Sequence, residues 1–326
     1  MKNMSWYLAL TTKLTKETEF RPKVKEVVTD MNGISDWQRK LKEKTLGYSC
    51  QSGIIKLPNQ DDISIIMNPE ITMIGVSDGH GPYGHYCSYI VQQILPRLIL
   101  SNPHYPHDIC RALSNSFLFS HEALKEIAEK QETFNVSMSG TTFTLALHDE
   151  KNEKLFISHV GDSRAIIAKR KNTKIVAKSL TNDHNMKDSR EYARIMVAEG
   201  DIRQEGKQGP LRFYCKGTNY PGLAISRSIG DSISKMYGVI CKPDISEIDL
   251  TLDDLFVVVA TDGVWEKMND QEVIEIVQQQ GRSNAQQAAK EIVSQSQRLW
   301  RAENIFHCDD ISCVVYWFNK RNTTVD

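Results

Sequence analysis

The stretch ITMIGVSDGHG, residues 71–81, joins an apolar run directly to an Asp-Gly pair. Far along the chain, LFVVVATDGV at 255–264 repeats the order of apolar run, hydroxyl residue, aspartate and glycine. A single Asp-Gly pair is an ordinary turn signal, because both residues tolerate the positive φ that tight turns need. Two such strand ends, one followed by a histidine, weaken that interpretation and favour a shared chemical role for the two aspartates.

The composition is that of an ordinary globular chain. Its 326 residues suit one large domain or two smaller ones. Forty basic and 41 acidic residues nearly cancel, so no net charge favours nucleic acid or an anionic membrane. The seven cysteines are scattered without a CxxC pair, which argues against a disulfide framework or a structural zinc site. The apolar patch WYLAL is too short for a signal peptide or a membrane span. We expect a soluble cytoplasmic protein, with the nucleus left open.

The apolar patterns predict an α+β chain rather than a repeating βαβ unit. Strands are expected at 63–68, 71–78, 255–262 and 310–318, and a four-stranded antiparallel meander between 141 and 181. Helical spacing is found over 85–101, 107–130, 188–199, 270–280 and 284–301.

Three further segments lack a strong core pattern. Residues 203–222 are rich in Gly, Gln and Pro and are expected to form an irregular loop. The lysine-rich residues 1–45, with a helix over 35–44, are expected to form an N-terminal extension outside the core. Residues 319–326 are expected to form a frayed tail.

Five separated segments place a carboxylate where an apolar strand meets a loop. The residues are Asp61 with Asp62, Asp78, Asp162, Asp262, and Asp309 with Asp310. Each one alone would be an ordinary cap or turn residue. If these strand ends meet at one edge, they form a cluster of like charges that needs cations to be stable. Oxygen-only ligands suit Mg²⁺ or Mn²⁺ rather than zinc.

Eight stretches, in order along the chain, resemble the metal-dependent PP2C (PPM) family of protein serine/threonine phosphatases. They are NQDD (59–62), GVSDGHGPYG (75–84), SGTTFTLAL (139–147), VGDSRAII (160–167), LTNDH (180–184), GLAISRSIGD (222–231), VVVATDGVWEKM (257–268) and DDISCVVY (309–316). The resemblance implies a four-layer αββα sandwich, in which a central antiparallel β-sandwich is flanked by helix pairs. It implies a phosphatase domain over 46–318, with a variable flap at about 203–222 beside the active site.

Matched positions in these stretches imply the ligands of two metal ions and of a weaker third. Asp78 matches the carboxylate that bridges both ions, and the Gly79 carbonyl supports one of them. Asp262 and Asp309 match further ligands, and Asp162 matches a ligand of the third ion. Asp61 matches the acid that holds waters at the metals.

Two positions depart from the family pattern. Lys56 stands where the family usually has a phosphate-binding arginine, and it keeps the charge without the bidentate fork. Gln60 replaces the glutamate of a frequent Glu-Asp pair, so its part in metal binding is left open. The motif residues Arg164, Arg227 and Asp231 are expected to form an ion-paired scaffold, and Thr141 and Thr142 to hydrogen-bond behind the metal edge.

The resemblance implies hydrolysis of phosphoserine and phosphothreonine in phosphoprotein substrates by a metal-activated water. His80 would be the general acid that protonates the leaving alkoxide. We expect a monomer with no nucleic-acid partner. Two alternatives stay open: a pseudophosphatase that binds partners with little turnover, which Gln60 and Lys56 favour, and a hydrolase of small phosphoesters.

Overall fold

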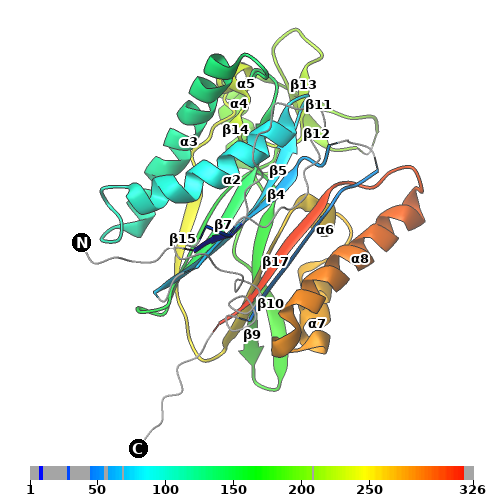
Figure 1. Ribbon diagram of the computed structural model, residues 1–326. Coiled ribbons are helices and arrows are strands. Elements are labelled where there is room, and N and C mark those ends of the chain that lie inside the picture. The colour runs from blue at the N-terminus through cyan, green and yellow to red at the C-terminus, as the bar shows by residue number, and fades with distance from the viewer. Residues whose placement is uncertain are drawn as a thin grey trace, which may run out of the picture.

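Two antiparallel sheets pack against each other and carry helices on their outer faces (Figure 1). Figure 1 is a computed structural model, and it describes residues 7–9, 28–29, 45–54, 58–67, 70–207 and 209–318. The predicted helix over 35–44, the predicted tail over 319–326, and Lys56 lie outside the described residues. Among the helices that are described, none combines the length and the apolar character that a membrane crossing requires.

The larger sheet is built around the first Asp-Gly strand. Its strand order is β15-β8-β7-β5-β4-β1-β2. The short strand β6 also pairs with β5, and β14 pairs with β6. The strands are β1 (Tyr7–Ala9), β2 (Val28–Thr29), β4 (Asp61–Met67), β5 (Ile71–His80), β6 (Gly140–Thr141), β7 (Phe143–Asp149), β8 (Lys154–Val160), β14 (Ile229–Gly230) and β15 (Asp244–Asp249). The strands predicted at 63–68 and 71–78 are found as β4 and β5, which are antiparallel neighbours.

The second sheet contains the other Asp-Gly strand, in the order β10-β9-β16-β17-β3. Its strands are β3 (Leu46–Gln51), β9 (Arg164–Lys171), β10 (Lys174–Ser179), β16 (Asp254–Ala260) and β17 (Ile311–Trp317). The single meander predicted between 141 and 181 is therefore wrong, because β8 belongs to the larger sheet and β9 to this one. The chain crosses between the sheets at residues 161–163, and Gly161 makes the turn at φ +98°. Alternating apolar residues predict strands but do not say which sheet each strand joins.

Helix pairs cover the outer faces of both sheets. α2 (Gly84–Ser101) and α3 (Ile109–Gln131) pack on the larger sheet through a cluster that includes Phe117 and Phe143. α7 (Asp270–Gln280) and α8 (Ala285–Glu303) pack on the second sheet around Phe256 and Trp300. A third cluster lies between the sheets and joins β4, β5 and β7 to β9, β16 and β17. The predicted α+β class is confirmed.

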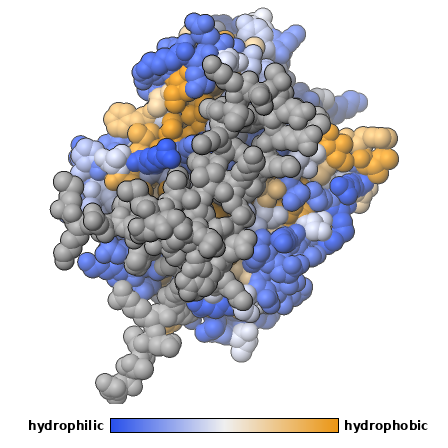
Figure 2. Space-filling view, viewed as in Figure 1, coloured by the Kyte–Doolittle hydropathy of each residue, from blue (hydrophilic) through white to orange (hydrophobic). Residues whose placement is uncertain are grey.

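The surface of the second helix pair follows the usual amphipathic division. In Figure 2 the solvent-facing side of α7 and α8 is largely hydrophilic, as expected for helices that bury one apolar stripe. Hydrophobic residues gather at the right-hand edge of the view, over the loop between α8 and β17. In that loop Ile305 and Phe306 are 66% and 78% exposed.

A small third sheet lies where an irregular loop was predicted over 203–222, so that prediction is wrong. β11 (Asp201–Gln204), β12 (Leu211–Tyr214) and β13 (Pro221–Leu223) form it, and α4 (Ser189–Val197) packs beside it. Its strands have three or four residues, too few to show a clear alternation of apolar and polar residues. The unit has its own apolar core, which includes Ile195 and Phe213.

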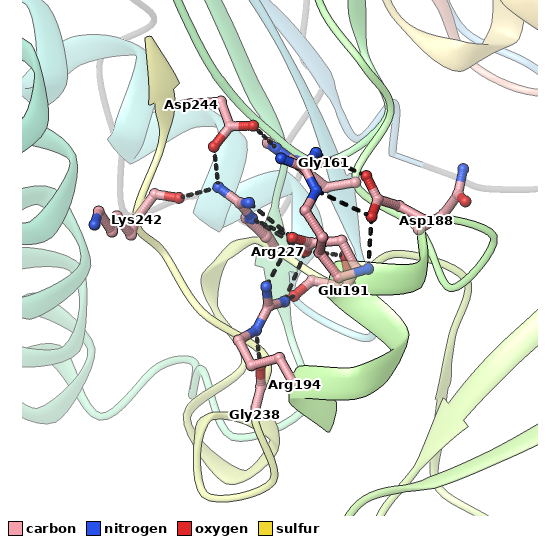
Figure 3. Close-up of polar contacts among 12 residues, drawn as sticks. Gly161, Asp188, Glu191, Arg194, Arg227, Gly238, Lys242 and Asp244 are labelled. Atoms are coloured by element: carbon pink, nitrogen blue, oxygen red, sulfur yellow. Dashed lines mark hydrogen bonds and ion pairs between the residues drawn. The ribbon is translucent and has the colours of Figure 1, made fainter. Parts of the chain in front are cut away.

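A buried network of charges fixes α4 to the sandwich (Figure 3). The Glu191 side chain, 2% exposed, accepts hydrogen bonds from Arg194 at 2.7 Å and from Arg227 at 2.7 Å. Arg227 continues the network to the Asp244 carboxylate of β15 at 2.6 Å, and Arg194 donates to the Gly238 carbonyl at 2.8 Å. The scaffold role predicted for Arg227 is confirmed.

We expect Glu191→Gln to lower the free energy of unfolding by about 3 kcal/mol, because it removes the buried charge that Arg227 and the partly exposed Arg194 share, and Arg227 keeps only Asp244. The measurement is chemical denaturation near neutral pH. Burial opposes ionisation of Glu191, but the hydrogen bonds from Arg194, Arg227 and Ser226 outweigh it and lower its pKa. The stabilisation is therefore present above the unfolded-state pKa of about 4.3 and is lost as the pH falls through the lower folded-state pKa. The difference in the free energy of unfolding between wild type and variant should therefore become smaller in acid.

Glu199→Gln is the matched control. Glu199 pairs with Lys216, but its side chain is 71% exposed and its ion pair is screened by water, so we expect little or no loss of stability. Equal losses in the two variants would contradict the structural role assigned to the buried network.

Candidate metal centre

Three aspartates from both sheets come together at one edge of the sandwich. Asp78 lies near the end of β5, Asp162 lies in the crossing from β8 to β9, and Asp262 follows β16 at the start of the short helix α6 (Asp262–Trp265). One carboxylate oxygen from each lies within 4.8 Å of the others. The two Asp-Gly strand ends that the sequence singled out therefore meet, because the sheets that contain them are stacked with these ends at the same edge.

Asp61 lies beside this group. It is the register partner of Asp78 across β4 and β5 and is 3% exposed. Its Oδ2 accepts a hydrogen bond from the Thr261 hydroxyl at 2.8 Å, while its buried Oδ1 has no hydrogen-bond partner in the described part of the chain. A buried carboxylate oxygen without a donor is costly unless something positive approaches it.

The two C-terminal aspartates have different surroundings. The charge of Asp309 acts on both Asp61 and Asp262, although Asp309 lies outside the group of three close carboxylates. Asp310 instead accepts from the backbone N–H groups of Gln60 and Gly53, each at 2.7 Å, and so holds the chain just before β4. Of this pair, Asp309 is the one whose charge raises the pKa of Asp262.

Burial and mutual repulsion raise the pKa values of several of these carboxyl groups. Burial raises the pKa of Asp262, and the nearby charges of Asp78, Asp162 and Asp309 raise it further. Burial, followed by the charge of Asp183, raises the pKa of Asp162 to about 7. Burial and the charge of Asp310 likewise raise the pKa of Asp61. An all-oxygen group of this kind fits a hard divalent cation such as Mg²⁺ or Mn²⁺.

The backbone around Asp78 is held tightly from behind. The Asp78 N–H donates to the Thr142 hydroxyl at 3.0 Å, and the Asp78 carbonyl accepts from Thr142 N–H and from the Thr141 hydroxyl. This confirms the expectation that both threonines hydrogen-bond behind the metal edge. Gly79 must be a glycine, because a Cβ there would lie 2.2 Å from the Gly84 carbonyl oxygen.

Gln60 is buried, and only one end of its side-chain amide has a hydrogen-bond partner among the described residues. Its side-chain amide donates to the Gly81 carbonyl at 2.9 Å, which an amide can do and an ionised carboxylate cannot. Its Oε1 is buried without a hydrogen-bond partner among the residues described. The structure therefore gives a local reason for glutamine at this position.

His80 contacts an aspartate from a distant part of the chain. Its Nε2 lies 2.7 Å from Oδ2 of Asp231, and its side chain is 18% exposed. The sequence placed Asp231 in an ion-paired scaffold with arginines, but the described contacts of its carboxylate are with His80 and with the Ser228 hydroxyl. Nothing in the spacing of residues 80 and 231 could have predicted this contact.

A pocket of about 180 Å³ opens beside the cluster. It lies between the carboxylates and the third sheet, and its lining includes Asp162, Asp262, Glu266, Arg164 and Leu211. Arg164 is held by Asp183 at 2.9 Å and by Asp270 at 2.8 Å, which confirms its scaffold role.

The sequence reasoning missed Glu266, a solvent-exposed carboxylate in the lining of this pocket. Partial desolvation raises its pKa, and the charge of Asp309 raises it further. Its position four residues after Asp262 places both on one side of a helical turn, and that spacing was the signal available in the sequence.

Comparisons with known proteins agree with this geometry. The protein phosphatase 2C family model matches residues 50–305. Probable protein phosphatase 2C 72 of Arabidopsis thaliana is 29% identical, over 85% of this chain and 86% of that protein. Probable protein phosphatase 2C 34 of the same plant is 30% identical, over 85% of this chain and 76% of that protein.

A solved structure has the same fold. The crystal structure of serine-threonine phosphatase 2C from Toxoplasma gondii superposes with a TM-score of 0.71, over 84% of this chain and 94% of that one. It is 19% identical, so it bears on the fold alone. The matched family model and the relatives, together with the cluster of aspartates at the sandwich edge, show that this chain belongs to the protein phosphatase 2C family and is a protein phosphatase of that type.

Proposed function

We propose that the carboxylate cluster binds two Mg²⁺ or Mn²⁺ ions, with a third bound more weakly, and that the chain hydrolyses phosphoserine and phosphothreonine in proteins. The observation that carries the proposal is the approach of Asp78, Asp162 and Asp262 to within 4.8 Å. Asp78, the Gly79 carbonyl, Asp262 and Asp309 would be ligands of the first two ions, and Asp162 of the third. Bound divalent cations of this kind make water a better nucleophile and neutralise phosphate charge.

The side chains around the cluster would perform the remaining steps. Asp61, through its unpartnered oxygen, would orient water for attack on phosphorus. His80, two residues after Asp78, would give a proton to the serine or threonine oxygen as it leaves. Lys56 would contact the substrate phosphate, a role proposed from the sequence alone because this residue lies outside the described part of the chain.

The wider architecture fits a protein substrate. The pocket beside the cluster is bounded on one side by the third sheet, through Leu211 and Pro210. We propose that this flap, within a phosphatase domain over 46–318, contacts the phosphoprotein and influences substrate choice. We also propose that the enzyme acts as a monomer in the cytoplasm.

We expect purified protein to release phosphate from a phosphothreonine peptide with Mn²⁺ or Mg²⁺ and to stop when EDTA is added. Asp78→Asn should reduce kcat by at least about a hundredfold, because a group that positions charge in the transition state is removed. Asp249→Asn is the control, since its side chain is 85% exposed, and it should retain activity. No turnover by folded wild type at millimolar Mn²⁺ would contradict the proposed function.

Metal binding should also be visible without activity. Mn²⁺ should raise the melting temperature of the wild type, and a free concentration of about one hundred times Kd would add about 2.7 kcal/mol to its stability. Asp262→Asn should lose this gain, yet its metal-free form should be no less stable than wild type, because one of several repelling charges is gone. Calorimetric melting with Mn²⁺ and with EDTA measures both effects. An undiminished Mn²⁺ gain in the variant would contradict the ligand role.

Gln60→Glu tests why this position departs from the family pattern. We expect the metal-free protein to lose about 1–3 kcal/mol of stability, because the Gly81 carbonyl would lose its donor and face a second acceptor. Gln204→Glu is the control, since that amide contacts carbonyls at 3.4 and 3.5 Å on the exposed surface. Tighter Mn²⁺ binding by Gln60→Glu in titration calorimetry, without a loss of stability, would show that this position is a ligand site instead.

A further inference from the structure

The contact between His80 and Asp231 is buried, short and supported from several sides. The Asp231 side chain is 0% exposed, and its Oδ2 lies 2.7 Å from His80 Nε2. The same oxygen accepts from the Ser228 hydroxyl at 2.5 Å. The Lys235 ammonium group donates to that hydroxyl oxygen at 3.0 Å and to the Ser228 carbonyl at 2.8 Å. Burying a carboxylate costs free energy unless it is paired and hydrogen-bonded, and these contacts provide that pairing for Asp231.

Three short strand segments bring these residues together. In the sheet register His80 is opposite Gly140, and Gly140 is opposite Gly230, the residue before Asp231. Gly140 must lack a side chain, since a Cβ there would lie 2.3 Å from Asp231 Oδ2. The Asp231 carboxylate therefore occupies the space that a side chain at position 140 would fill.

The backbone at Asp231 is strained in a way that points to a functional position. Asp231 adopts φ 50° and ψ 49°, a left-handed conformation that costs a residue other than glycine free energy. Its N–H donates to the Ser139 carbonyl at 2.9 Å, and the next N–H donates to the Val136 carbonyl at 2.9 Å, so the conformation is fixed by neighbours. A residue that only capped α5 (Ser232–Lys235) would not need this conformation, and its side chain makes no cap hydrogen bond.

We infer that Asp231 is a positioning residue for the general acid: it fixes the ring of His80 so that Nδ1, not Nε2, gives the proton to the leaving oxygen. This inference rests on the proposed function, in which His80 is that acid. An ionised carboxylate 2.7 Å from Nε2 accepts a hydrogen bond from that nitrogen, and so fixes the orientation and the tautomer of the ring. Nδ1 is then the ring nitrogen left to face the substrate.

The proton transfer can be written in full. As the bond between phosphorus and the serine or threonine oxygen breaks, its electron pair stays on that oxygen. The oxygen takes the proton from Nδ1, and His80 becomes neutral with its Nε2 proton still shared with Asp231. Solvent returns a proton to Nδ1 before the next turnover, since the ring is partly exposed. Asp231 itself neither gains nor loses a proton.

The test is Asp231→Asn, a change that keeps the shape of the side chain. With saturating Mn²⁺, kcat for a phosphothreonine peptide should fall by about a hundredfold, the usual scale of general acid catalysis. Activity on 4-nitrophenyl phosphate should fall by less than about threefold, because a nitrophenolate ion leaves without a proton and needs little acid catalysis. A purely structural role would lower both activities together.

Three controls separate positioning from general damage. In a His80→Gln background, Asp231→Asn should cause no further loss on the peptide, because residues that act as one unit are not additive. Nitrogen NMR of the metal-free wild type should show neutral His80 with its proton on Nε2, and the variant should lose that preference. Asp249→Asn should match wild type in every assay. If Asp231→Asn does not fold, Ser228→Ala, which removes the second donor to Oδ2, should show the same selectivity with a smaller loss.

The outcomes are distinguishable. Failure of the wild type to act on the phosphothreonine peptide would overturn the proposed function and this inference with it. Wild-type turnover with equal losses on both substrates, or with additive losses in the double variant, would overturn the inference and leave the proposed function standing.

Discussion

The repulsion among partly buried carboxylates at one edge of the sandwich is the constraint on which the rest of the site depends. Asp61, Asp162 and Asp262 each have a pKa raised first by burial, and neighbouring carboxylates raise each of them further. Local structure alone would not assemble such a group, since like charges in a low dielectric oppose each other strongly. The free energy must come from elsewhere, and the apolar cluster between the two sheets is the obvious source.

Hydrogen bonds from neighbouring residues hold the proposed metal ligands in position. Asp61 is bonded by Thr261, whose N–H in turn donates to the Ser312 carbonyl of β17 at 3.0 Å. Asp78 is bonded through its backbone by Thr141 and Thr142. These neighbours lie in or next to strands of both sheets, so strand pairing sets the positions of the acids. Ligands fixed by their neighbours in this way bind a cation with little further ordering.

The sequence predicted those elements whose apolar patterns are long enough to show a clear period. The strands that end at Asp78 and Asp262 are long and apolar, and the helices have full amphipathic turns, so these were identified. The strands of the third sheet are too short to show a period, and β8 and β9 were assigned to one meander because alternation does not reveal the partner strand. Asp231 and Glu266 were missed as site residues because their contacts depend on three-dimensional register or on a single helical turn. The contact of Asp231 is a property of packing, whereas the spacing of Asp262 and Glu266 is a local signal that a single helical turn makes weak.

The tripeptide Asp78-Gly79-His80 connects the two halves of the proposed chemistry. Side chains two residues apart on a strand share one face, so the Asp78 carboxylate, proposed as a metal ligand, and the His80 imidazole leave the strand on the same face, from Cα atoms about 6.7 Å apart. Gly79 faces the other way, where the Gly84 carbonyl leaves no space for a side chain. In-line displacement requires attacking and leaving oxygens on opposite sides of phosphorus. In the proposed mechanism this spacing would place a phosphoryl group between the carboxylates that need cations and a histidine held by its own carboxylate.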